Sequence, residues 1–237
     1  MAVDNKRLGV IGGMGPKATS VFMDQVIEHT VADRDQDHID MVVLNHATLP
    51  DRTTVILENA GERFLKAVER DLRLLEQAGA DHIAIPCNTS HYFYDEMQAM
   101  TSIPIIHMVE ETIKEIGRRF GSVRKVGVLA TNGTLRSGVY RKVCDKYGLE
   151  LQEPEESVQR EIMNIIYNDI KRGRMISSEG LERIILDLIE QDGCDCVIIA
   201  CTELSCIRLG EQAAKFSVDA MDVLVRKSIE LSGKHYG

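Results

Sequence analysis

The stretch that decides the fold is His82-Ile-Ala-Ile-Pro-Cys87-Asn88-Thr89-Ser90, which recurs with variations as Cys196-Val-Ile-Ile-Ala-Cys201-Thr202-Glu203-Leu204. In each copy a short apolar run stops at a cysteine, and polar residues that favour helix starts follow at once. Short apolar runs that feed helices are typical of buried parallel strands. Each cysteine is therefore predicted to lie where a strand ends and a helix begins, which is where open α/β sheets bind ligands.

The rest of the chain carries the same duplication. Residues 7–13 match residues 125–132, and residues 104–110 match residues 216–222. Together with the cysteine segments these pairs occur in one order, at offsets that drift by only a few residues. Chance explains one such pair of apolar runs, but three pairs in the same order indicate two similar halves.

Helical patterns fill the intervals between the predicted strands. Apolar residues recur at helical spacing over residues 16–33, 62–77, 136–147 and 178–191. Strands that alternate with helices predict mainly parallel sheets flanked by helices, an α/β fold. We expect a first domain of residues 1–100 plus 207–237 and a second of residues 101–206, with the C-terminal helix packed on the first and the active site in the cleft between them.

Charge and composition narrow the class of protein. The 237 residues carry a formal net charge of −9, which argues against nucleic acid or an anionic membrane as a partner. No apolar run reaches the length of a membrane span, and the first residues lack a secretory apolar region. We expect a soluble cytoplasmic protein. An anionic substrate would then need its own local arginine or lysine.

The six cysteines are expected to be reduced thiols. An even count suggests disulfides only in short secreted chains, and the cysteine spacings lack the pattern of a zinc site. Cys144, Cys194 and Cys206 are interpreted as packing or surface residues, and Cys196 as a core residue.

The glycine-rich turn Gly12-Gly13-Met14-Gly15-Pro16-Lys17-Ala18 formally fits a dinucleotide fingerprint. The second strand nevertheless ends in Asn45-His46 instead of the acidic residue that would hold a ribose, and no Gly-Lys-Ser/Thr follows. The turn is better interpreted as one that lets backbone amides approach a small anion such as a carboxylate. No nucleotide cofactor is predicted.

The paired cysteines suggest acid/base chemistry. A thiol at a helix N-terminus has a lowered pKa, since the helix dipole stabilises its thiolate. A substrate carboxylate held by the residues after each cysteine would place its α-carbon between two sulfurs. One thiolate could remove the α-proton while the opposite thiol delivers a proton to the other face. The chain offers no lysine motif for pyridoxal phosphate and no metal cluster, so no cofactor is expected. The alternative to a catalytic role is that both cysteines are core residues that only pack.

Six short motifs resemble the aspartate/glutamate racemase family, and within it the cofactor-independent aspartate racemases. They are residues 12–16, 49–53, 86–89, 130–134, 171–173 and 200–203, and they run over nearly the whole length in family order. The resemblance implies a two-domain, pseudo-twofold α/β fold, often dimeric, that acts on a small acidic amino acid. It also implies that Cys87 and Cys201 are the acid/base pair.

Further roles are implied only by this resemblance. Arg52 and Lys171 would hold the side-chain carboxylate, and Met14 would line the pocket. The amino-acid head would be held by Asn88, Thr89, Thr131, Thr134 and Thr202. From the residues alone, Arg52 could equally be an exposed loop arginine, and Lys171 could be a solvated helix end.

Departures from the pattern leave several alternatives open. Cell-wall glutamate racemases carry Asp-Ser in the first glycine turn and His after the second Cys-Thr, whereas this chain has Gly12-Gly13 and Glu203. A racemase of aspartate, with glutamate as a second substrate, is therefore the leading hypothesis. A dicarboxylate lyase or isomerase and a non-catalytic small-anion binding protein are the alternatives. His91 is expected to be structural, and Glu203 either a helix-start carboxylate or a partner of the substrate amine.

Overall fold

Two parallel β-sheets form the framework of the protein, whose structure is a computed structural model that describes residues 6–174 and 177–237. The first sheet has the order β2 (Met41–Asn45), β1 (Leu8–Gly12), β3 (His82–Ala84). The second has the order β5 (Glu150–Gln152), β4 (Lys125–Leu129), β6 (Cys196–Ile199), β7 (Ser217–Asp219). All the pairings between these strands are parallel.

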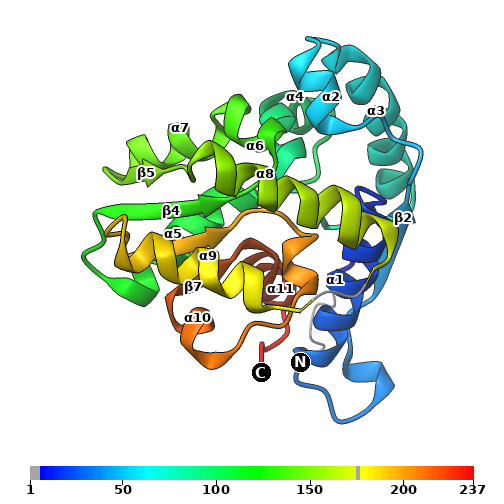
Figure 1. The fold of residues 1–237 in the computed structure, drawn as a ribbon. Coiled ribbons are helices and arrows are strands. Elements are labelled where there is room, and N and C mark those ends of the chain that lie inside the picture. The colour runs from blue at the N-terminus through cyan, green and yellow to red at the C-terminus, as the bar shows by residue number, and fades with distance from the viewer. Residues whose placement is uncertain (1–5, 175–176) are drawn as a thin grey trace.

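The two sheets repeat one plan. β1 and β4 are flanked by β2 and β5 on one side and by the cysteine-bearing strands β3 and β6 on the other. Even β7 has a counterpart, because Ile105 forms a parallel bridge with Ile83 at the outer edge of β3. The predicted α/β fold of two similar halves is therefore confirmed, and Figure 1 shows the helices that surround them.

Helices connect the strands in both halves. The first half contains α1 (Pro16–Glu28), α2 (Arg52–Leu57), α3 (Gly61–Gln77) and α4 (Tyr94–Ala99). The remaining helices are α5 (Met108–Phe120), α6 (Asn132–Ser137), α7 (Val139–Lys146), α8 (Glu156–Asn164), α9 (Glu179–Glu190), α10 (Glu211–Phe216) and α11 (Ala220–Leu231). Across residues 6–174 and 177–237, no helix combines the length and apolar character needed to cross a bilayer.

The boundaries predicted from the sequence for two of the helices were wrong. The helix predicted over residues 16–33 ends at Glu28. The helix predicted over residues 136–147 is two helices, α6 and α7, because Gly138 adopts a left-handed conformation with φ of 66° and turns the chain between them. Only glycine takes this conformation without strain, so the break is encoded by that one residue.

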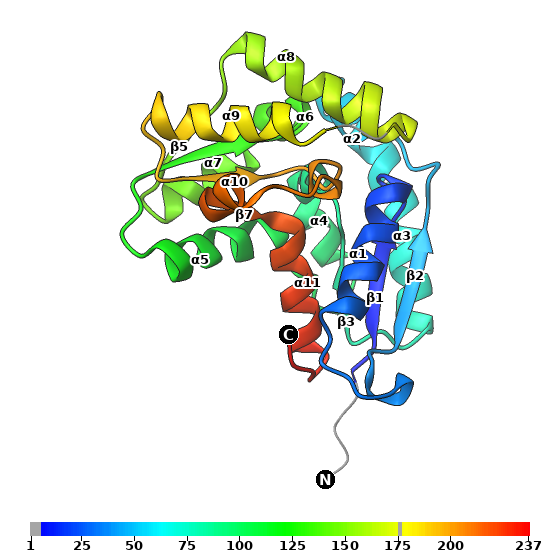
Figure 2. The same cartoon turned by 60° about the horizontal axis from the view of Figure 1, so that its bottom comes forward.

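Two helices cross from one sheet to the other: α5 runs from the first sheet to the core of the second half, and α11 runs from the second sheet to the core of the first. α5 follows the Ile105 bridge and buries Val109 and Ile113 with the strands of the second sheet. α11 follows β7 and buries Leu224 and Val225 with β1 and α1 of the first sheet. Figure 2 shows α11 between α1 and β1 on one side and α5 on the other, and α11 packs against both α1 and α5. This exchange ties the two halves together.

The division of the chain at residues 100 and 207 stays a prediction. The structure adds a feature that this division did not include: β7 pairs with β6, and Ala213 of α10 packs in a core cluster of the second half. Residues 211–219 thus lie with the second sheet, and the chain reaches the first sheet only with α11.

Both faces of each sheet are covered, which explains the unbroken apolar runs. Ile11 faces the cluster that includes the core residues of α3, while its neighbour Val10 faces α1 and α11. Likewise Val197 faces α9, while Ile198 faces α5. Strands buried on both faces need apolar residues at every position instead of alternation.

We predict that Gly12→Ala destabilises the protein. A Cβ at residue 12 would lie 2.3 Å from Cγ2 of Thr19 on α1, and the Thr19 hydroxyl already accepts a hydrogen bond from the Gly13 amide at 2.8 Å. Overpacking of this kind lowers the free energy of unfolding by about 1–3 kcal/mol, measurable by urea denaturation. The control is Gly117→Ala in the exposed interior of α5, where the new methyl meets no atom within 4 Å. That change should stabilise by about 0.5–1 kcal/mol, and equal losses in both variants would contradict the argument.

Candidate active site

The two cysteine turns meet between the halves. Cys87 follows β3 and Cys201 follows β6, as the sequence predicted, and each side chain is 5% exposed. The Thr202 hydroxyl donates a hydrogen bond to the carbonyl of Pro86 at 3.1 Å, so the residues that flank the cysteines are joined directly. Both cysteines line the same cavity. All six cysteines of the chain are free.

This cavity is small and is lined mainly by polar and charged residues. Its volume is about 20 Å³, the space of one or two water molecules. Residues of both halves line it: Met14, Asp51, Arg52, Thr53, Cys87, Asn88, Thr89, Thr131, Tyr167, Lys171, Cys201, Thr202 and Glu203. Every site residue expected from the sequence is in this set except Thr134, which is buried behind Thr89 and Thr131.

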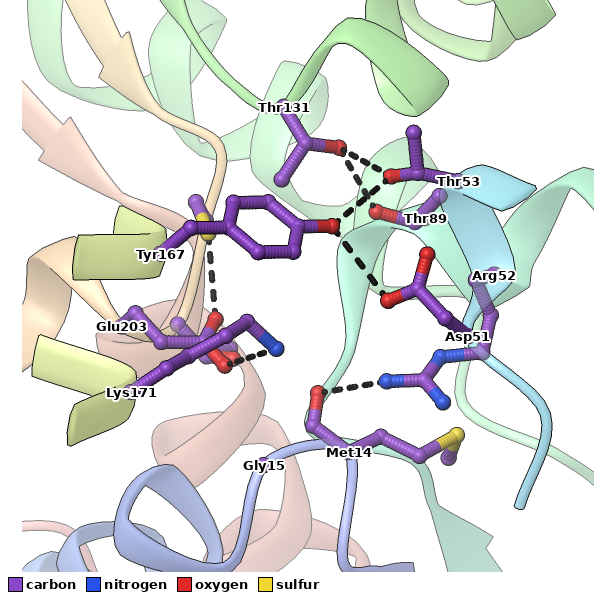
Figure 3. A network of polar contacts seen from close by, with 12 residues as sticks. Met14, Gly15, Asp51, Arg52, Thr53, Thr89, Thr131, Tyr167, Lys171 and Glu203 are labelled. Carbon is purple, nitrogen blue, oxygen red and sulfur yellow. Dashed lines mark hydrogen bonds and ion pairs between the residues drawn. The ribbon is translucent and has the colours of Figure 1, made fainter. Parts of the chain in front are cut away.

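A cluster of threonine hydroxyls closes one end of the cavity. Thr89 Oγ1 lies 2.8 Å from Thr134 Oγ1 and 3.1 Å from Thr131 Oγ1, and Thr53 donates to Thr131 at 3.5 Å. Figure 3 shows Thr53 and Thr89 of the first half facing Thr131 of the second. Each hydroxyl can donate or accept, so the cluster can rearrange its hydrogen bonds when a carboxylate arrives.

Asn88 has a donor to spare. The buried hydroxyl of Tyr140 donates to Asn88 Oδ1 at 2.6 Å, which fixes the orientation of the amide. The amide nitrogen Nδ2 is buried and has no hydrogen-bond partner among the described residues. A buried donor without an acceptor is unfavourable, so this group is suited to bind a carboxylate oxygen of a ligand.

Arg52 is a buried cation held by carbonyl groups. Its side chain donates to the carbonyl of Pro50 at 2.8 Å and to that of Met14 at 3.3 Å, and the residue is 7% exposed. Within the described part of the chain, no carboxylate oxygen forms an ion pair with it, and its Nε is buried without a partner. Since an uncompensated buried charge is costly, the site favours an anionic ligand.

Lys171, Glu203 and Cys201 form a chain of contacts on the opposite wall. Lys171 Nζ lies 3.0 Å from Glu203 Oε1, and the Cys201 thiol donates to Glu203 Oε2 at 3.1 Å. Burial is the largest single influence and acts to lower the pKa of Lys171, but the charge and hydrogen bond of Glu203, together with the two nearby cysteines, outweigh it and the pKa is raised. Lys171 is therefore charged at neutral pH. In Figure 3 it points toward the same space as Arg52, from the other side.

The expected lowering of the thiol pKa is wrong for Cys201. Burial raises its pKa well above the usual value, and the neighbouring Glu203 carboxylate raises it further. The helix predicted after Cys201 is only a short 3-10 turn, Leu204–Cys206, which provides little dipole, whereas the 3-10 turn Asn88–Phe93 after Cys87 continues into α4. Cys201 is thus a thiol at neutral pH in the free protein.

His91 supports the Cys87 turn from behind. Its Nδ1 lies 3.0 Å from the carbonyl of Cys87, and its Nε2 accepts a hydrogen bond from the amide of Met108 at 3.2 Å. Burial and the neighbouring His107 lower its pKa to about 4, so the ring is neutral. These contacts fit the structural role that the sequence suggested. Ser205, four residues after Cys201, lies at the corresponding position and donates to Asp219 at 2.7 Å.

Four residues of the cavity were not predicted as site residues: Asp51, Thr53, Tyr167, and Glu203, whose role the sequence left open. The Tyr167 hydroxyl lies 3.3 Å from Asp51 Oδ2 and 3.2 Å from Thr53 Oγ1, so it bridges the halves over the cavity. Asp51 and Thr53 flank Arg52, and Tyr167 stands one helical turn before Lys171. These positions beside predicted site residues were the available signal.

Comparisons with known proteins agree with this architecture. The model of the Asp/Glu/Hydantoin racemase family matches residues 11–227. The chain is 31% identical over 226 residues to the broad specificity amino-acid racemase RacX of Bacillus subtilis (strain 168), which covers 94% of this chain and 96% of RacX.

Solved structures show the same relationship. The aspartate racemase of Picrophilus torridus superposes with a TM-score of 0.83 at 27% identity, covering 98% of this chain and 96% of that one. A glutamate racemase of Francisella tularensis, in complex with D-glutamate, shares the fold with a TM-score of 0.61 at 18% identity, over 96% and 81% of the two chains. Because the family model spans most of the sequence, the chain belongs to the Asp/Glu/Hydantoin racemase family.

Proposed function

We propose that this protein is a cofactor-independent racemase of acidic amino acids, with aspartate as its main substrate, and that Cys87 and Cys201 are its two acid/base groups. The observation that carries the proposal is the position of both thiols on one cavity beside Arg52, a buried cation with no ion-pair partner among the described residues. An acidic amino acid supplies the missing anion and places its α-carbon near the sulfurs.

Binding groups for both ends of the substrate are present. The free amide donor of Asn88 and the hydroxyls of Thr89 and Thr202 would hold the α-carboxylate. Arg52 and Lys171 would hold the side-chain carboxylate, Arg52 through two N–H groups at once. Two fixed ends leave the α-carbon little freedom to turn away from the thiols.

The reaction then needs one proton transfer on each face of the α-carbon. A thiolate removes the α-proton, the carbanion is stabilised by hydrogen bonds to its carboxylate, and the thiol on the opposite face delivers a proton. One bond to hydrogen breaks and another forms, so the configuration inverts with no net change in atoms. The two sulfurs end with their protonation states exchanged.

The surroundings of Cys201 make the resting enzyme asymmetric. With Cys201 held as a thiol by Glu203, Cys87 acts as the first base and Cys201 as the first acid. In the reverse direction Cys201 must lose its proton. The nearby ammonium of Lys171 stabilises the resulting thiolate once the substrate draws Lys171 toward the cavity.

Admission of the substrate requires the cavity to widen, because about 20 Å³ cannot hold an amino acid. The hydroxyl of Tyr167 spans the gap between the halves, and the Lys171–Glu203 ion pair holds the same segment to the Cys201 turn within the second half. Both residues lie between Ile165 and Arg172, in consecutive π and 3-10 turns. Movement of this segment would open the cavity and break both contacts together.

The named relatives support a racemase and leave its range open. The structural relative from Picrophilus torridus is named an aspartate racemase, which favours aspartate. RacX is named a broad specificity racemase, which favours a wider range as the second candidate. Glutamate adds one methylene, worth only about 1–3 kcal/mol of discrimination. The expected cytoplasmic location and homodimer remain predictions of this proposal.

We expect Cys87→Ser and Cys201→Ser each to abolish inversion. General acid/base groups typically contribute about 10²–10⁴-fold to the rate, so inversion of L-aspartate should fall by at least that factor in both variants, and its α-hydrogen exchange in D₂O should fall likewise in the variant that lacks the base for the L-form. Exchange is measured by NMR and inversion by chiral chromatography. The control is Cys144→Ala, a buried cysteine outside the cavity, which should retain the rate. Exchange that survives in both serine variants would exclude the mechanism, and release of CO₂ would indicate a lyase instead.

A second prediction concerns the carboxylate beside Cys201. Glu203→Gln removes a negative charge next to the sulfur, so the thiolate becomes less unfavourable and the pKa of Cys201 falls. Alkylation of Cys201 by iodoacetamide, followed by peptide mass spectrometry, should then begin at lower pH than in the wild type. Glu190→Gln on the exposed surface of α9 is the matched control. Alkylation profiles that coincide for all three proteins would show that Glu203 does not govern the thiol.

A further inference from the structure

A second, larger cavity lies beside the catalytic one. It measures about 290 Å³ and is lined by the glycine turn, the start of α1 and part of the loop after β2: Gly13, Gly15, Pro16, Lys17, Ala18, Ala47, Leu49, Asp51, Arg52, Ile170, Lys171 and Glu203. Asp51, Arg52, Lys171 and Glu203 line both cavities. These four charged residues therefore form the wall between them, and Figure 3 shows Lys171 and Arg52 above the Met14–Gly15 turn.

The wall lies where a substrate side chain would end. In the proposed binding mode the side-chain carboxylate of aspartate contacts Arg52 and Lys171, so any longer side chain must pass between them. The second cavity is then the space that a longer side chain enters. Leu49 and Ile170 supply apolar surface for its methylene groups.

The far end of this cavity favours an anion. α1 begins there with Pro16, has no side-chain cap and carries no acidic residue in its first turn. The amides of Lys17 and Ala18 are in that first turn, where backbone N–H groups lack acceptors within the helix, and the helix dipole is positive. The exposed Lys17 adds a cation at the rim.

The wall contains two cations and two carboxylates, and both carboxylates already have partners. Glu203 is engaged by Lys171 and by the Cys201 thiol, and Asp51 caps α2 through the amide of Thr54 at 2.9 Å and contacts Tyr167. Arg52 lines the cavity with a buried Nε that has no partner among the described residues. This buried guanidinium, which also lines the catalytic cavity, is a second observation besides the helix N-terminus that favours an anionic ligand.

We propose that this second cavity is a side-chain subsite for acidic amino acids longer than aspartate. Their methylene groups would lie between Leu49 and Ile170, past Arg52, and the terminal carboxylate would reach the N-terminus of α1 beside Lys17. The proposal rests on the proposed racemase function and specifies its substrate class: 2-aminoadipate and 2-aminopimelate as well as aspartate.

The test compares α-hydrogen exchange in D₂O for L-aspartate, L-2-aminoadipate and L-norleucine, which has a neutral side chain of similar length to that of 2-aminoadipate. Wild-type enzyme should exchange 2-aminoadipate, and norleucine much more slowly. Ala47→Leu fills the cavity from its exposed rim and should lower kcat/KM for 2-aminoadipate at least tenfold, with aspartate within twofold. Lys17→Gln should raise KM for 2-aminoadipate alone, whereas Lys215→Gln on α10 should change nothing.

Two results would overturn the subsite: exchange of aspartate without exchange of 2-aminoadipate, or equal losses for both substrates in Ala47→Leu. Calorimetric binding keeps the test independent of turnover. If no amino acid exchanges, the racemase proposal fails, yet the subsite still predicts that 2-aminoadipate binds to the wild type and at least tenfold more weakly to Ala47→Leu. Equal binding to both proteins would refute it.

Discussion

The structure depends on one constraint: the ends of two strands from different sheets must stay together. The hydrogen bond from Thr202 to the carbonyl of Pro86 joins the two cysteine turns at the point of contact. Two helices also hold the halves together: α5 packs its apolar face on the second sheet, and α11 packs its apolar face on the first. A change that loosened this packing would act on the cavity directly, because no single half contains all of its walls.

Electrostatics inside the cavity follow from which charges are paired. Lys171 and Glu203 form an ion pair, and Glu203 also accepts a hydrogen bond from the Cys201 thiol. The opposite charges on that wall therefore compensate each other. Arg52 is held by backbone carbonyls, which orient its guanidinium but do not cancel its charge. An uncompensated buried positive charge is energetically unfavourable. An anionic ligand would relieve this cost and a neutral one would not, so the charge favours anions.

Much of this arrangement could be predicted from the sequence, because the runs before Cys87 and Cys201 have the unbroken apolar pattern of strands covered on both faces. The parts that failed depend on tertiary contacts. Asn88 and Thr89 have the side chains of residues that begin a helix, but Tyr140 and Thr131 engage these side chains, and the chain forms a 3-10 turn before α4 starts. The lowered pKa expected for the Cys201 thiol failed because burial and the Glu203 carboxylate, which the sequence pattern does not reveal, raise that pKa. Tyr167 was missed because its role appears only when residues 165–169 are folded over α2.

The unequal surroundings of the two sulfurs have a thermodynamic consequence. The two sheets share one strand plan, but His91 behind one cysteine turn and Ser205 behind the other make the turns chemically distinct. Mirror-image amino acids have identical free energies in water, so the equilibrium constant between them is one. Under the proposed mechanism the two directions must then share a single kcat/KM. If Glu203 makes kcat differ between the two directions, KM must therefore differ by the same factor. Glu203 can change the substrate concentration at which each direction saturates, but it cannot change the equilibrium ratio of the two enantiomers.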